Sequence, residues 1–208
     1  MKKLFWGDSA MQTFFKIMLA GAAMANLTAC SKTVAWEEEV PLNTGEVIWV
    51  KRTGSYEFQS ESGNPLKFAY RPQWRTSIQF TYRGKSYSHT DDAGLVMLSI
   101  SGDGTPSLVA TAAQFDWHLK NRYYCVVPYY VQFRPDNTGN KWTWPSEIEP
   151  WLFGLRTNLM FGVPALAASG KKFTIADREF ENASLLILGD PYRQIAPTFD
   201  HPRCLRKT

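Results

Sequence analysis

The sequence predicts an all-β fold, an antiparallel sandwich-like domain with one short helix. Two patterns predict it: β-prone runs recur about every ten residues between turn-forming residues, and several of these runs alternate apolar with polar side chains. The 8 Trp, 9 Tyr and 13 Phe supply large side chains for a core, and a chain of 208 residues is long enough to bury one.

The first strand is expected at residues 46–51, whose apolar side chains fall on both faces, as in a strand buried on both sides. The residues before it, 36–45, are interpreted as an acidic lead-in, with three consecutive glutamates, followed by a turn. Residues 76–82 alternate apolar and polar side chains, and a β-prone run at 87–90 follows a Gly turn, which predicts a hairpin.

A second hairpin is expected from residues 95–100 and 107–112, because an Asp-Gly turn separates them. The longest β-prone run is 123–134. The turn-forming residues 135–139 should fold it back onto a strand at 141–144.

The carboxyl-terminal part has a weaker pattern. Apolar residues from Ile148 to Leu159 keep a helical spacing with Pro150 near the start, which predicts the short helix. Late strands are expected at 173–175, 178–181 and 185–188, followed by an irregular tail from about residue 190.

The amino terminus has the layout of a secretory signal, with Lys2, Lys3 and Lys16 ahead of an apolar run at 17–29. Thirteen helical residues span about 20 Å, less than the roughly 30 Å hydrocarbon core of a bilayer, so a removed signal is favoured over a permanent transmembrane helix. Translation could start at Met1 or at Met11.

The apolar run ends in Leu27-Thr28-Ala29-Cys30, which resembles the lipobox of bacterial lipoproteins. The resemblance implies cleavage before Cys30, a diacylglycerol thioether on its sulfur and three acyl chains in all. Because Ser31 and not Asp follows, it also implies sorting to the outer membrane, facing the periplasm, in a Gram-negative host. The segment 36–50 is similar to the first strand of uncharacterised proteobacterial lipoproteins, which lend no activity. The alternative is an ordinary signal peptide cleaved after Ala25, with Cys30 unmodified.

The expected organisation is a signal peptide at 1–29, the lipidated cysteine and a short tether at 30–35, and a single β-rich domain at 36–208. The signal contains three lysines and one aspartate, so the net charge of +4 falls to +2 in the mature 179 residues. This charge is too small for a nucleic-acid footprint, and no Gly-rich phosphate loop follows a strand. The sequence therefore predicts no nucleic-acid or nucleotide partner, no cofactor and no metal site.

With Cys30 acylated, Cys125 and Cys204 are the one pair that an oxidising periplasm could bridge. A disulfide across that separation would contribute roughly 4 kcal/mol in the chain-entropy model. The alternative is a buried Cys125 and a free Cys204.

Seven other residues are candidates for a functional site, and each has a structural alternative. Exposed tryptophans stack on sugars but equally fill a core, and paired carboxylates cleave glycosidic bonds but are usually solvated. The candidate ligand-binding aromatics are Trp142, Trp144 and Trp151, and the candidate catalytic residues are Glu147, Glu149, Asp116 and His118.

The sequence favours a lipid-anchored envelope protein whose β-domain is a non-catalytic binding or structural module for an envelope protein or a glycan. The alternative is a membrane-tethered periplasmic hydrolase that acts on envelope glycans through the candidate catalytic residues.

Overall fold

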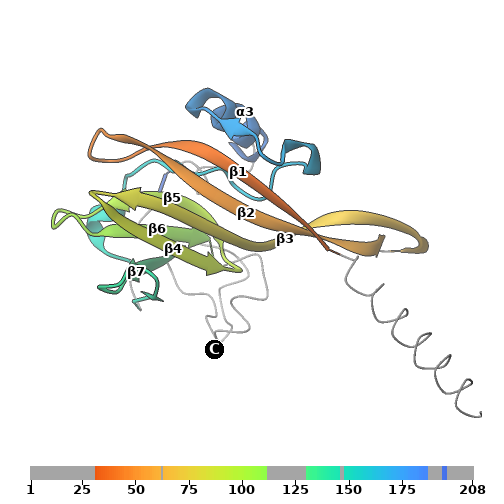
Figure 1. The fold of residues 1–208 in the computed structure, drawn as a ribbon, viewed down its shortest axis with the longest axis horizontal. Coiled ribbons are helices and arrows are strands. Elements are labelled where there is room, and N and C mark those ends of the chain that lie inside the picture. Colours follow the sequence, from red (N-terminus) through yellow and green to blue (C-terminus); the bar gives the residue numbers. More distant parts are fainter. Residues whose placement is uncertain (1–30, 62, 112–129, 146–147, 187–193, 196–208) are drawn as a thin grey trace, which may run out of the picture.

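A computed structural model describes residues 31–61, 63–111, 130–145, 148–186 and 194–195. Two sheets pack face to face, which confirms the predicted all-β, sandwich-like fold (Figure 1). Their strands pair antiparallel except for β1 and β9, which pair in parallel. The first sheet has the order β4-β3-β2-β1-β9 and the second β5-β6-β7-β8. Within the described residues no helix is long and apolar enough to cross a membrane. The strands are β1 (Ser31–Pro41), β2 (Val47–Glu61), β3 (Asn64–Tyr82), β4 (Lys85–Asp91), β5 (Gly94–Ile100), β6 (Pro106–Thr111), β7 (Tyr130–Pro135), β8 (Trp142–Thr143) and β9 (Lys172–Phe173).

Both predicted hairpins are confirmed, as β3–β4 and β5–β6. The predicted strand at 46–51 is the start of β2, which is much longer than expected and continues to Glu61. The fold-back onto 141–144 is also confirmed, since β7 pairs with β8. Residues 123–129 of the longest predicted run lie outside the described residues.

The segment 31–35, expected to be a tether, is instead the first part of β1. β1 pairs with β2 from Ser31 opposite Glu57 to Pro41 opposite Val47. The residues from Ser31 onward form a strand because their side chains alternate, so that Val34, Trp36 and Val40 are buried on the same face. Residues 31–35 therefore belong to the folded domain.

The predicted helix at 148–159 is wrong, because only a single 3-10 turn, η2 (Pro150–Leu152), forms there. Gly154 follows with φ +83°, a left-handed conformation that a helix does not continue. A second such turn, η3 (Leu166–Ala168), precedes β9.

In the described part of the chain the α-helix is α3 (Ile175–Leu186), which replaces the predicted strand at 178–181 and includes residues 185–186 of the strand predicted at 185–188. Residues 187–188 lie outside the described residues. Thr174 and Asp177 start it with reciprocal side-chain to backbone bonds, Thr174 N–H to Asp177 Oδ2 at 2.9 Å and Asp177 N–H to Thr174 Oγ1 at 3.3 Å. These two bonds form a capping box, so the helix has a sequence-encoded beginning.

One side of the sandwich is closed by the turn between β7 and β8. Trp142 Nε1 donates to the Ser88 carbonyl at 2.6 Å, and Ser88 N–H donates to the Gly139 carbonyl at 3.1 Å. These bonds tie β8 of the second sheet to β4 of the first, and Trp142 packs against the core between the sheets.

His89 lies in this core, 8% exposed, with its ring 4.6 Å from that of Phe133 and 5.3 Å from that of Trp142. Desolvation by burial lowers the pKa of His89 to about 4. The imidazole is therefore neutral in the folded chain at neutral pH and serves as a packing residue.

His89 should make the stability of the domain depend on pH. Its imidazole titrates near 6.5 in the unfolded chain and near 4 in the folded one, so the unfolded state binds the extra proton between these values. Stability should be full above pH 6.5 and fall by up to about 3 kcal/mol as the pH drops to about 4. Urea unfolding of wild type and His89→Phe at several pH values in this range measures how the free energy of unfolding depends on pH. The variant should lose less stability on acidification, and parallel curves for the two proteins would contradict the assignment.

Candidate functional site

The other side of the sandwich is closed by the segment 155–164, which runs between β5 and β1. Asn158 is its central residue: its side-chain oxygen accepts from Leu98 N–H at 2.8 Å, and its amide nitrogen donates to the carbonyls of Leu98 and Pro41 at 2.7 and 2.8 Å. The N–H groups of Asn158 and Leu159 both donate to the Val96 carbonyl at 3.1 Å. Asn158 therefore joins one strand of each sheet.

Two side chains of α3 hold this segment from outside. Arg178 Nη1 donates to the Asn158 carbonyl at 2.8 Å and to the Glu39 carbonyl at 3.0 Å. Asn182 donates to the Leu159 carbonyl at 3.0 Å and accepts from Phe161 N–H at 3.0 Å. Burial lowers the pKa of Arg178, and the nearby Glu38 carboxylate opposes that shift.

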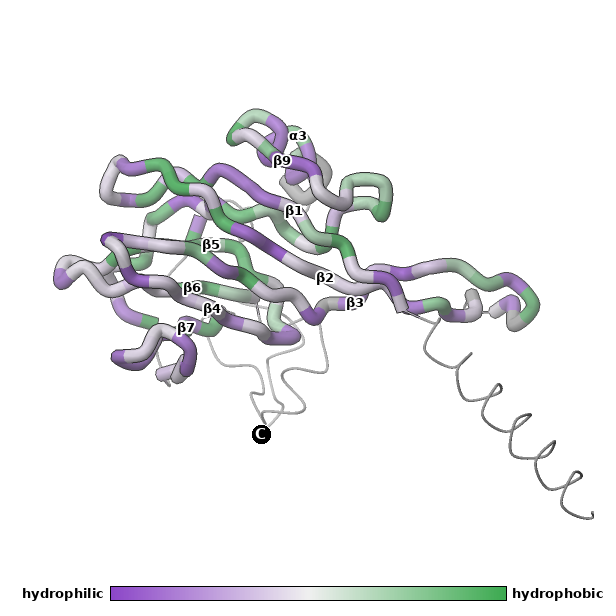
Figure 2. Tube along the Cα trace, in the orientation of Figure 1, coloured by the Kyte–Doolittle hydropathy of each residue, from purple (hydrophilic) through white to green (hydrophobic). Residues whose placement is uncertain are grey.

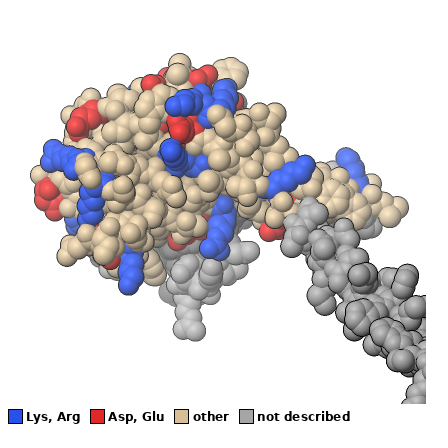
Figure 3. Space-filling model, viewed as in Figure 1, with Lys and Arg blue, Asp and Glu red and all other residues tan. Residues whose placement is uncertain are grey.

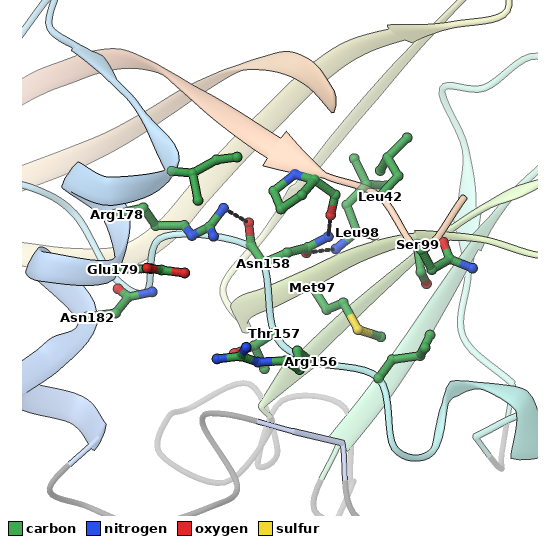
Figure 4. Close-up of a pocket in the computed structure, with 14 residues that line it drawn as sticks. Leu42, Met97, Leu98, Ser99, Arg156, Thr157, Asn158, Arg178, Glu179 and Asn182 are labelled. Atoms are coloured by element: carbon green, nitrogen blue, oxygen red, sulfur yellow. Dashed lines mark hydrogen bonds between the residues drawn. The ribbon is translucent and has the colours of Figure 1, made fainter. Parts of the chain in front are cut away.

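A cavity of about 590 Å³ opens where α3, β5 and this segment meet. Figure 4 shows Arg178, Glu179 and Asn182 on one side of it, with Met97 and Leu98 opposite. Its volume lies within the range of ordinary small-molecule sites.

The lining of the cavity combines apolar and charged side chains. Leu42, Met97 and Leu98 supply buried apolar surface, while Arg156, Arg178 and Glu179 line the same space. Such a lining suits a molecule that has an apolar body and polar groups.

Ser99 adds a polar group to this lining. The residue is 1% exposed, and within the described residues its hydroxyl has no hydrogen-bond partner. A buried hydroxyl without a partner is rare in folded proteins.

Glu149, a candidate catalytic carboxylate, belongs to a hydrogen-bond network on the second sheet. Oε1 accepts from Arg134 Nη1 at 2.6 Å, and Oε2 accepts from Gln132 Nε2 at 2.7 Å and Trp151 Nε1 at 3.0 Å. Gln132 is fully buried and also donates to Ser107 Oγ at 2.8 Å. These donors fix the carboxylate in place, and the network attaches η2 to β7.

The three candidate aromatics lie in different surroundings. Trp142 packs against the core and donates to Ser88, and Trp151 packs against the cluster of Leu152 and Ile195 on the second sheet. Trp144 is 41% exposed.

Six residues singled out from the sequence lie outside the described residues, so the structure places none of them. They are Cys30, Cys125 and Cys204, together with Asp116, His118 and Glu147.

Sequence reasoning missed the residues that line the cavity, Arg156, Asn158 and Arg178 among them. A capping box at Thr174 was the available signal for α3 and would have placed Arg178 on a helix. No local signal marks Asn158, because its three side-chain bonds reach residues 60 and 117 positions away.

In the described part of the chain, no group of three or more His, Cys, Asp and Glu residues could hold a metal ion. Comparison of the chain with family models, with curated proteins and with solved structures finds no match.

Proposed function

We propose that this chain is a lipid-anchored cell-envelope protein that works by binding and not by catalysis. One observation carries the proposal: β1 begins at Ser31, the residue after the lipobox cysteine. Acyl chains on Cys30 would thus hold the sandwich directly at a bilayer surface, with the periplasmic face of the outer membrane as the expected location.

The proposed anchor is strong enough to be permanent. A single acyl chain binds a membrane only marginally, whereas two or more give stable attachment, and the lipobox resemblance implies three. The domain would then meet its envelope protein, glycan or small-molecule ligand in the layer next to the membrane.

A binding role fits the geometry of the domain. The cavity beside α3 offers apolar surface together with the charged groups of Arg156, Arg178 and Glu179, which favour a ligand with an apolar body and polar groups. Glu149, the described member of the candidate catalytic set, is engaged by three donors that attach η2 to the second sheet.

Replacing the lipobox cysteine should release the protein from membranes. Cys30→Ala removes the sulfur that would receive the diacylglycerol, so we expect loss of radiolabelled palmitate and either a soluble product or an uncleaved precursor. Membrane fractionation and palmitate labelling of wild type and variant measure both effects.

Cys125→Ala and Cys204→Ala are matched controls, because each removes one sulfur and leaves the lipobox intact. Both should keep the full palmitate label. A label that survives in Cys30→Ala, or that is absent from the wild-type protein, would overturn the proposal.

A further inference from the structure

The β2–β3 hairpin extends beyond the sandwich as a narrow arm (Figure 1). We define the arm as residues 57–72, which pair from Glu57 opposite Arg71 to Glu61 opposite Asn64. Where burial is described, every residue of the arm is exposed except Tyr70, which is half-buried. The arm therefore contributes little to the core of the domain.

The arm has two faces of opposite character. Side chains alternate along a strand, so Phe58, opposite Tyr70, shares one face with Phe68, which lies opposite Ser60. The other face carries Glu57 and Gln59, whose side chains are joined by a hydrogen bond of 3.2 Å. The arm is thus an amphipathic ribbon.

The aromatic side chains of the apolar face contact one another but remain exposed. The rings of Phe58 and Phe68 stack at 5.3 Å, and Phe58 lies 5.2 Å from Tyr70. Phe58 is nevertheless 45% exposed, Phe68 54% and Leu66, near the turn, 89%. Figure 2 shows apolar segments along this otherwise polar arm, and Figure 3 shows isolated basic side chains on a mostly uncharged surface.

At the base of the arm, the same face is buried against the core of the domain. Two residues before Phe58, on the same face, Tyr56 is buried in a cluster with Trp36 and Phe173, and its hydroxyl donates to the Pro164 carbonyl at 2.9 Å. Beyond Tyr56, Tyr70 packs against the same cluster, and the Lys32 ammonium lies 4.2 Å from the centre of its ring.

The position of the anchor indicates what meets this face. Ser31 pairs with Glu57, the first residue of the arm, and β1 runs away from the turn of the hairpin. Residue 30 is joined to Ser31, whose α-carbon is 3.8 Å away by covalent geometry. The four residue steps from Glu57 to Glu61 extend about 13 Å further at ~3.3 Å each. This reach exceeds the depth of one headgroup layer, roughly 5–8 Å on each side of the ~30 Å core. The arm is therefore long enough to span the interface, where aromatic side chains and lysines are favoured.

We infer that the arm is a membrane-contact device: its apolar face inserts into the interface of the bilayer that holds the acylated Cys30. This inference rests on the proposed function, because the anchor selects the lipid surface as the occupant. Insertion beside the anchor adds a second attachment point, and two points fix the orientation of the sandwich on the membrane, which a single flexible anchor does not.

Photocrosslinking from lipid tests the inference on the native chain. Protein extracted from membranes is reconstituted into phosphatidylethanolamine–phosphatidylglycerol vesicles that contain a lipid with a diazirine in its acyl chain. After illumination, label should appear on peptides covering residues 57–72. The turn at 42–46 serves as an internal control, since it lies at the opposite end of β1 and β2 and should carry at least five times less label.

Two triple variants compare the faces of the arm. Replacement of Phe58, Leu66 and Phe68 by serine should lower labelling of the arm at least fivefold. Replacement of Gln59, Lys67 and Ala69 by serine changes the opposite face and should leave labelling within twofold of wild type. Should either variant fail to fold, the peptide map of the native chain still decides.

The outcomes separate the two proposals. Acylated protein whose arm takes no more label than the turn at 42–46, or whose arm crosslinks to another protein instead, would overturn the inference and leave the anchor standing. A chain without acyl groups on its Cys30 peptide would overturn the proposed function, and the labelling of its arm on added vesicles would then judge the arm alone.

Discussion

Replacing Glu38 by leucine is expected to destabilise the domain by about 3–5 kcal/mol, because it leaves the buried charge of Arg52 without its partner. Glu38 and Arg52 are 0% and 1% exposed, and Arg52 Nη1 lies 2.9 Å from Glu38 Oε1. Arg52→Met should cost a similar amount for the same reason. Urea denaturation followed by circular dichroism measures both.

The pair also fixes the segment 155–164 to the first sheet. Arg52 Nη1 donates to the Met160 carbonyl at 2.9 Å, and Met160 N–H donates to Glu38 Oε2 at 2.8 Å. A Glu38→Leu, Arg52→Met double variant should therefore remain less stable than wild type while losing at least about 2 kcal/mol less than the sum of the single losses. Strictly additive losses would contradict the coupling.

Asn158→Ala should cost about 2–4 kcal/mol, the second largest effect. The change removes three side-chain hydrogen bonds and leaves the N–H and carbonyl of Leu98 unpaired in a buried strand. Because Asn158 joins β5 to β1, the loss should appear as a lower midpoint of global urea unfolding.

Asn140→Ala is the matched control. Asn140 is exposed, and its side chain accepts one hydrogen bond, from Ser88 Oγ at 2.9 Å. The same change of residue type should cost less than about 0.5 kcal/mol there. Equal losses at the two positions would contradict the role given to Asn158.

The strands were predictable wherever alternation and turn chemistry agree, as in the β3–β4 and β5–β6 hairpins. Glu38 shows the limit of local interpretation. Its place among three consecutive glutamates predicts an acidic lead-in, yet it shares strand parity with Trp36 and Val40, and that parity places it inside. The charge of Glu38 is balanced by Arg52 on the neighbouring strand β2. Which residue of β2 lies beside Glu38 depends on the register of the two strands, and composition does not reveal that register.

The cavity beside α3 and the arm differ in how far the sequence could reveal them. The cavity depends on contacts between segments distant in the chain, and no short pattern encodes these. The arm does have a local signal, since Leu66, Phe68 and Tyr70 alternate with polar or small residues. Alternation predicts a ribbon with an apolar face, but the topology decides whether a second sheet covers that face.

The mass of the intact chain extracted from membranes tests the central claim most directly. Lipid anchoring predicts a chain of 179 residues that begins at Cys30, with the added mass of one diacylglycerol thioether and one amide-linked acyl chain. An exported chain that begins elsewhere, or that has the mass of the bare polypeptide, would contradict it.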